Sequence, residues 1–133
     1  MDKQVKAITA GIILNPQKEK ILLVRRADSM WGDAWSIPGG HIDFGETVEE
    51  ALKRELKEEL NLKTLKVKFV GYEQFTPETK PDKQFISLNF LVIANEQIQP
   101  NHEIKEAKWF SLNELNNIKH KVPNLDFLRE PLN

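Results

Sequence analysis

Three glutamates, Glu55, Glu58 and Glu59, are the residues of this 133-residue chain best placed to do chemistry, because they stand together where the sequence has helical periodicity. Counting about 100° per residue, Glu55 and Glu59 each fall within about 20° of Val48, inside the apolar arc of the helix. Glu58 falls at the edge of that arc, about 80° from Val48. Like charges at this spacing repel, and burying unpaired carboxylates costs several kcal/mol. A positive charge must therefore compensate them.

Two kinds of positive charge could compensate this cluster. A divalent cation does so most directly, because Mg²⁺ and Mn²⁺ prefer oxygen ligands and Mg²⁺ typically shares its sites with water and substrate phosphates. Lysine or arginine side chains from another segment could instead form a buried salt-bridge cluster with the same carboxylates. The helical geometry alone leaves both alternatives open.

The helix that carries these acids is predicted over residues 47–60. Its apolar positions recur at four-residue spacing: Val48, Leu52, Leu56 and Leu60. Thr47, with Glu50 three residues further on, is a capping box and marks the start. Asn61 marks the end, because asparagine tolerates the left-handed conformation that follows many helices.

The rest of the chain predicts strands around this helix. Five segments favour extended structure, the last of them short: 5–14, 20–26, 65–76, 85–94 and 107–110. The first two are expected to form a hairpin across the turn at 15–18, and residues 38–40 are predicted to be a second turn. A capped helical turn is predicted from Ser111 and a last short helix at 124–129. We therefore expect a single α/β domain over 1–133, a sandwich with a mixed sheet.

Composition excludes several classes of protein. The 19 basic and 20 acidic residues nearly cancel, which argues against a nucleic-acid binder. The absence of cysteine excludes disulfides, thiolate metal sites and a cysteine nucleophile. No segment reaches the ~18–20 apolar residues that cross a bilayer, and no small-residue cleavage site follows the N-terminus. We therefore expect a cytoplasmic monomer or homodimer with a small-molecule partner and neither a membrane nor a nucleic acid as partner.

From Gly40 onward the sequence GHIDFGETVEEALKRELKEELNL resembles the Nudix box, a glycine, five residues, a glutamate, seven residues and then Arg-Glu-U-x-Glu-Glu-x-Gly-U, where U is bulky and aliphatic. The matching positions are Gly40, Glu46, Arg54, Glu55, Leu56, Glu58, Glu59 and Leu62. Asn61 is the single departure and stands where the family has glycine, whose left-handed conformation asparagine can adopt. The Ile-Pro-Gly-Gly lead-in and Lys108-Trp109-Phe110 also resemble the family, so the resemblance spans most of the chain.

This resemblance implies a fold, a reaction and a metal site. Nudix hydrolases are α/β/α sandwiches that use Mg²⁺, or Mn²⁺ in its place, to cleave a nucleoside diphosphate linked to another group. By the family's motif, Glu58 and Glu59 are expected to bind the metal ion with the Gly39 carbonyl nearby. Glu55 is expected to share in metal binding. A bound divalent ion neutralises phosphate oxygens and lowers the pKa of bound water, which suits attack of water on phosphorus.

The resemblance also assigns the supporting and proton-accepting residues. Arg54 is expected to orient the acids through a pair with Glu46. Some members of the family use a glutamate of the box as the base, here Glu55, and others use a glutamate on a later loop. Glu103 resembles that later acid, although a solvated glutamate in a polar loop explains it equally well.

Positions outside the box resemble the MutT-type branch, which hydrolyses nucleoside triphosphates, including oxidised ones, to monophosphate and pyrophosphate. Arg25 and Arg26 end a strand where that branch has a phosphate-contacting arginine. Asn124 falls where that branch has a base-reading asparagine, or it caps the last helix. His41 stands where the branch often has lysine, so the triphosphate contact there is expected to be weaker, pH-dependent or absent.

Two other functions compete with this one. Pro77 resembles a mark of ADP-ribose pyrophosphatases, which favours ADP-ribose or a nucleotide sugar as the substrate, although a loop proline needs no such reason. A Nudix-like module that senses a nucleotide without hydrolysing it is disfavoured, because this box retains every acid. The preferred base, the number of metal ions and the physiological role are not encoded in a recognisable pattern.

Overall fold

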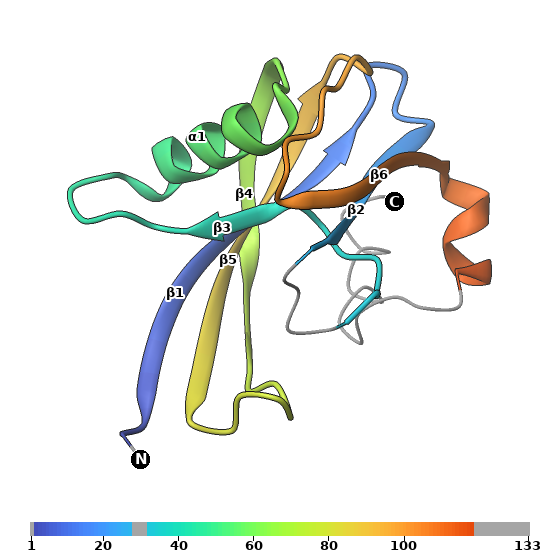
Figure 1. Cartoon of the computed structure of the whole chain (residues 1–133). Helices are drawn as coiled ribbons and strands as arrows, with labels where there is room; N and C mark the ends of the chain where they lie inside the picture. Colours follow the sequence, from blue (N-terminus) through green and yellow to red (C-terminus); the bar gives the residue numbers. More distant parts are fainter. Residues whose placement is uncertain (1, 28–31, 119–133) are drawn as a thin grey trace.

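The computed structural model describes residues 2–27 and 32–118, and their strands join into one mixed sheet beside the helix α1 (Figure 1). In chain order the elements are β1 Gln4–Leu14, β2 Lys20–Arg26, β3 Gly39–His41, α1 Val48–Leu60, β4 Thr64–Phe75, β5 Lys83–Ala94, β6 Ile104–Ser111 and the 3₁₀ helix η1 Leu112–Asn117. The strands lie side by side in the order β4–β5–β1–β2–β6, and β3 also pairs with β1. The predicted mixed α/β architecture is confirmed.

One edge of β1 is shared by two strands, which makes a fork in the sheet. Residues 8–10 of β1 pair with β3 and residues 13–14 pair with β2, both antiparallel, while β5 runs parallel along the whole opposite edge. Between the two pairings the N–H of Gly11 donates to the carbonyl of Pro38 at 2.9 Å. The β1–β2 pairing confirms the predicted hairpin, and the fork brings β3 up against the end of β2.

The helix α1 forms where the sequence predicts it and for the predicted reasons. The hydroxyl of Thr47 accepts a hydrogen bond from the Glu50 N–H at 3.1 Å, and the Glu50 carboxylate accepts one from the Thr47 N–H at 3.4 Å. Asn61 ends the helix in the left-handed region, with φ of 50°. The apolar stripe packs on the sheet in one cluster that includes Leu52, Leu56, Leu60, Ile13, Leu22, Val24, Phe90 and Val92.

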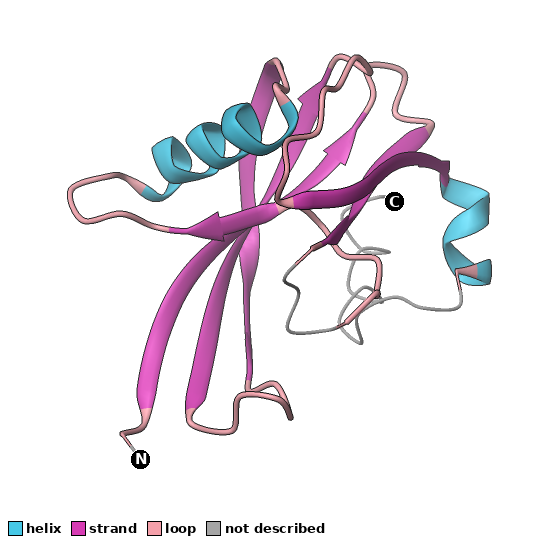
Figure 2. Cartoon of the chain, in the orientation of Figure 1, coloured by secondary structure: helices cyan, strands magenta, loops and turns pink. Residues whose placement is uncertain are grey.

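The opposite face of the sheet has its own apolar cluster. This cluster is made of Ile12, Leu14, Ile21, Leu23 and Phe110, with side chains of η1 packed on it. Trp35 packs on this cluster and contacts Phe110 edge-to-face, with ring centroids 4.9 Å apart. Figure 2 shows η1 and α1 as the helices of the described chain, and neither is long and apolar enough to span a membrane. The helix predicted at 124–129 lies outside the described residues.

Two sequence-based expectations about extended structure need correction. Residues 38–40 are not a turn, because β3 begins at Gly39 and pairs with β1. Both positions need glycine because neighbouring segments lie too close for a side chain. At Gly39 an added Cβ would lie 2.0 Å from the Thr9 carbonyl oxygen, and at Gly40 it would lie 2.5 Å from the carboxyl carbon of Glu55. The short strand expected at 107–110 is longer, because it pairs with all of β2.

Candidate active site

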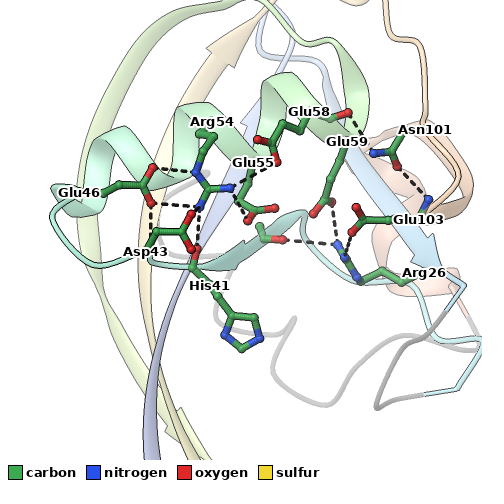
Figure 3. A network of polar contacts seen from close by, with 11 residues as sticks. Arg26, His41, Asp43, Glu46, Arg54, Glu55, Glu58, Glu59, Asn101 and Glu103 are labelled. Atoms are coloured by element: carbon green, nitrogen blue, oxygen red, sulfur yellow. Dashed lines mark hydrogen bonds and ion pairs between the residues drawn. The ribbon is translucent and has the colours of Figure 1, made fainter.

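The predicted acids meet where α1, β3, the end of β2 and the loop before β6 come together (Figure 3). The absence of a side chain at Gly40 lets α1 approach β3, so that the carboxyl group of Glu55 lies directly over that glycine. Glu55 and Glu59 are largely withdrawn from solvent, with side chains 14% and 2% exposed, whereas Glu58 is 57% exposed. The helical geometry therefore predicted the burial of the first two correctly and placed the third at the boundary.

Glu59 is a buried carboxyl group with only part of its hydrogen-bonding capacity used. Its Oε2 lies 2.7 Å from Nη1 of Arg26, and its Oε1 is buried with no hydrogen-bond partner within residues 2–27 and 32–118. Burial and, to a smaller extent, the hydrogen bond with the Glu55 carboxyl group raise the pKa of Glu59, Arg26 opposes them, and the net result is a pKa of about 8. An ionised Glu59 therefore has an incomplete set of partners among the described residues.

Arg26 is the positive charge that compensates Glu59. Besides Glu59, its guanidinium contacts the Gly39 carbonyl at 3.4 Å and the Glu103 carboxylate at 3.4 Å. These three oxygens come from α1, from β3 and from the loop before β6. One arginine thus joins the three segments that contain the predicted metal ligands and the predicted later-loop acid.

Arg54 organises the other end of the cluster. Its guanidinium donates to both oxygens of Glu46 at 2.7 and 3.0 Å, and it lies 2.9 Å from Glu55 and 3.3 Å from Glu58. The hydrogen bond with Glu46 raises the pKa of Arg54 and lowers the pKa of Glu46, so this pair is fully charged. The expected Arg54–Glu46 pair is present, and it fixes the direction in which Glu55 points.

Two further residues at the site were missed by the sequence analysis. Asp43 lies 3.4 Å from Arg54, and its N–H donates to the Glu46 carboxylate at 2.8 Å. Asn101 donates from Nδ2 to the Glu58 carbonyl at 3.1 Å and accepts from the Glu103 N–H at 2.9 Å. No local pattern marks either residue as part of the site, because the contact of Asp43 with Arg54 and that of Asn101 with Glu58 reach another segment.

The Asn101 contacts attach the Glu103 loop to the end of α1. The backbone N–H of Asn101 also donates to the Glu59 carbonyl at 2.8 Å, and the Ala27 N–H donates to the Glu103 carbonyl at 3.0 Å. Glu103 is 42% exposed, so its carboxylate remains accessible although its backbone is held on both sides.

The candidate substrate contacts are divided between the two faces of the sheet. Arg26 lies among the acids, but Arg25 pairs with Glu106 and lies over the Trp35 ring at 5.3 Å, away from them. The imidazole of His41 points away from the acids, while its backbone carbonyl accepts from Arg54 at 3.0 Å (Figure 3). The predicted base-reading Asn124 lies outside the described residues.

The oxygen donors at the site suit a hard divalent cation, although they are not gathered around one point. Carboxylates and a backbone carbonyl are the ligands that such ions prefer. Among the described residues no hydrogen bond competes for Oε1 of Glu59, so this oxygen is available to bind a metal ion. In the described part of the chain no three acidic or histidine side chains converge as a metal centre. Arg26 and Arg54 hold the carboxylates in separate groups, but the residues themselves fit the ion.

Comparison with known proteins gives consistent matches. The NUDIX domain matches residues 5–130 of the chain. The 8-oxo-dGTP diphosphatase of Haemophilus influenzae is 33% identical over 100% of this chain and 96% of its own length. The ADP-ribose pyrophosphatase of Methanocaldococcus jannaschii is 37% identical over 79% of this chain, and the match spans 61% of that protein. The crystal structure of a MutT protein from Methanosarcina mazei has a TM-score of 0.83 at 22% identity, covering 99% of this chain and 95% of that one, and shows the same fold.

Proposed function

The chain belongs to the NUDIX family, and we propose that it hydrolyses a nucleoside triphosphate, standard or oxidised, to the monophosphate and pyrophosphate. Relatives named as diphosphatases and pyrophosphatases support a hydrolase of nucleotide pyrophosphate bonds. The observation that carries the proposal is that Arg26 contacts Glu59 of α1, the Gly39 carbonyl of β3 and Glu103 of the loop before β6, which places these oxygens around one side chain. The full-length match to an 8-oxo-dGTP diphosphatase favours a triphosphate.

Members of this family use divalent metal ions, and we propose Mg²⁺ here. Glu55, Glu58, Glu59 and the Gly39 carbonyl would hold it, because they are oxygen donors on the facing surfaces of α1 and β3. When bound, such an ion neutralises phosphate oxygens and lowers the pKa of a bound water molecule.

The chain's own residues supply positioning and the base. Arg54 holds Glu55 in place through a direct contact, and its bidentate pair with Glu46 keeps the guanidinium from rotating. Either Glu55 or Glu103 accepts the proton as the water oxygen attacks phosphorus and the pyrophosphate leaves. Glu103 is favoured by its accessible carboxylate on a firmly held backbone. We also assign a phosphate contact to Arg26, whereas Arg25 is occupied with Glu106 on the other face.

A product assay tests this proposal. Each common and oxidised nucleoside triphosphate, ADP-ribose and several nucleotide sugars are incubated with protein and Mg²⁺, and products are separated by chromatography. Monophosphate plus pyrophosphate from a triphosphate supports the proposal. Glu59→Gln is expected to abolish this turnover, and full activity of that folded variant would contradict the metal assignment.

The second candidate is an ADP-ribose pyrophosphatase, which the relative from Methanocaldococcus jannaschii favours. It predicts AMP and ribose 5-phosphate from ADP-ribose at a rate above that of any triphosphate. Pro77 adds little support, because it is buried in the structure and packing explains it. Nucleotides that survive hours with protein and Mg²⁺ would instead indicate a sensing module.

A further inference from the structure

We propose that Arg26 is an exchangeable counter-cation: it occupies the acid cluster of the metal-free protein, gives way to the metal ion and then binds the substrate phosphates. This inference rests on the proposed function, because the ion and the nucleotide are those assigned above. It adds that one arginine strengthens the cooperative binding of metal and nucleotide.

The contacts of Arg26 place its charge among the donors proposed for the metal. Its Nη1 lies 2.7 Å from Glu59 and 3.4 Å from the Gly39 carbonyl, and its Nη2 lies 3.4 Å from Glu103 (Figure 3). A metal ion at Glu59 and the Gly39 carbonyl would compete with the guanidinium for the same oxygens, and two positive charges so close together repel strongly where water is excluded. Metal binding at Glu59 and Gly39 therefore requires the guanidinium to move.

The salt bridge between Arg26 and Glu59 leaves part of the carboxylate without a partner, which favours replacement of Arg26 by a metal ion. A buried salt bridge stabilises a protein only when the remaining lone pairs are also satisfied. Among the described residues Oε1 of Glu59 has no partner, and the contacts of Arg26 with the Gly39 carbonyl and with Glu103 are long, at 3.4 Å each. A small cation bound by several oxygens would use the donor that Arg26 leaves unsatisfied.

The position of Arg26 in the fold allows its side chain to move. It is the last residue of β2, at a register shift in the pairing with β6, where a bulge can redirect a side chain. The side chain is 23% exposed, so solvent already reaches it. An arginine displaced a short distance remains beside the cluster, where its planar fork suits a phosphate group that bridges to the metal.

The exchange predicts an unusual effect on metal affinity, because removal of Arg26 should increase it in the free protein. In the free protein the metal must displace Arg26, which weakens metal binding. A nucleotide offers the displaced guanidinium a phosphate, so it tightens metal binding, and by reciprocity the metal tightens nucleotide binding. Removing Arg26 is therefore expected to strengthen metal binding by the free protein while weakening the coupling, of which only the direct contact between phosphate and metal then remains.

The test measures Mn²⁺ binding directly, from the electron paramagnetic resonance signal of free Mn²⁺, without relying on turnover. Wild type, Arg26→Gln and Arg26→Met are titrated alone and with a triphosphate analogue whose α–β bridge cannot be hydrolysed. Arg25→Gln is the matched control, because it removes one positive charge from the adjacent residue on the other face. Circular dichroism confirms that each variant is folded.

We expect both Arg26 variants to bind Mn²⁺ about tenfold more tightly than wild type without nucleotide. After subtraction of the Mn²⁺ that the analogue binds in the absence of protein, the analogue is expected to tighten Mn²⁺ binding more in wild type than in these variants. Equal or weaker binding by the Arg26 variants, or the same gain in Arg25→Gln, overturns the inference. Wild type that binds no Mn²⁺ even with the analogue overturns the proposed function as well, whereas an active wild type without the Arg26 effect overturns this inference alone.

Discussion

Replacing Glu59 by glutamine is expected to make the metal-free protein more stable at alkaline pH, although the substitution removes a proposed metal ligand. Glutamine has nearly the same shape as a protonated glutamate and can still accept from Arg26. The folded protein holds the Glu59 proton up to a pKa of about 8, whereas the unfolded chain releases it near 4.5. Wild type therefore loses stability as the pH rises through this window, and the variant is spared that loss.

The structure sets the size of this effect. Because Glu59 is 1% exposed, solvent screens its charge very little. A difference between pKa values of 4.5 and about 8, at about 1.4 kcal/mol per pH unit, amounts to roughly 5 kcal/mol across the whole window. Since domains are typically stable by about 5–15 kcal/mol, the loss is a large share of the total.

The assay is urea unfolding with a chelator present, at several pH values across that window, for wild type and Glu59→Gln. The difference in unfolding free energy between them isolates Glu59 from every other titrating group. Glu58→Gln is the matched control, because it removes an exposed carboxylate from the same turn of α1. A difference between wild type and Glu59→Gln that stays constant with pH would refute the reasoning, and so would an equal slope for the control.

Three other substitutions test how the site is held. Arg54→Lys loses the bidentate pair, so kcat is expected to fall about 10–100-fold in steady-state assays; an unchanged kcat would contradict the positioning role. Asn101→Ala frees the Glu103 loop and is expected to reduce kcat about tenfold, but to have no further effect on Glu103→Gln; additive effects would show that it acts elsewhere. Gly40→Ala places a Cβ 2.5 Å from the carboxyl carbon of Glu55 and is expected to cost about 1–3 kcal/mol in urea unfolding together with activity, whereas wild-type behaviour would contradict the close approach.

The parts of the fold that the sequence predicted are those with local causes. The bounds of α1 follow from a capping box, a four-residue stripe and Asn61, all within one segment. The burial of Glu59 followed from its angle on the helix. The strand at β3 was missed because Gly39 and Gly40 carry no side chain whose alternation could mark it, and their reason lies in Thr9 and Glu55.

The parts of the site that escaped prediction depend on contacts between segments. The sequence showed that the acids needed a positive charge, but it could not tell that Arg26 rather than Arg25 supplies one. Which of two adjacent strand residues faces α1 depends on how β2 pairs with β1 and β6. Asn101 was passed over because its hydrogen bonds join residues far apart in the chain.

The fork in the sheet fixes Arg26 and Gly39 independently of the segment that connects them. Arg26 ends one strand of the fork and Gly39 begins the other, and each strand is held on β1 by its own pairing. Residues 27–38 therefore join two positions that the sheet fixes independently. The relative placement of Arg26 and the Gly39 carbonyl is thus a property of the sheet, set by two separate strand pairings with β1 rather than by the segment that connects them.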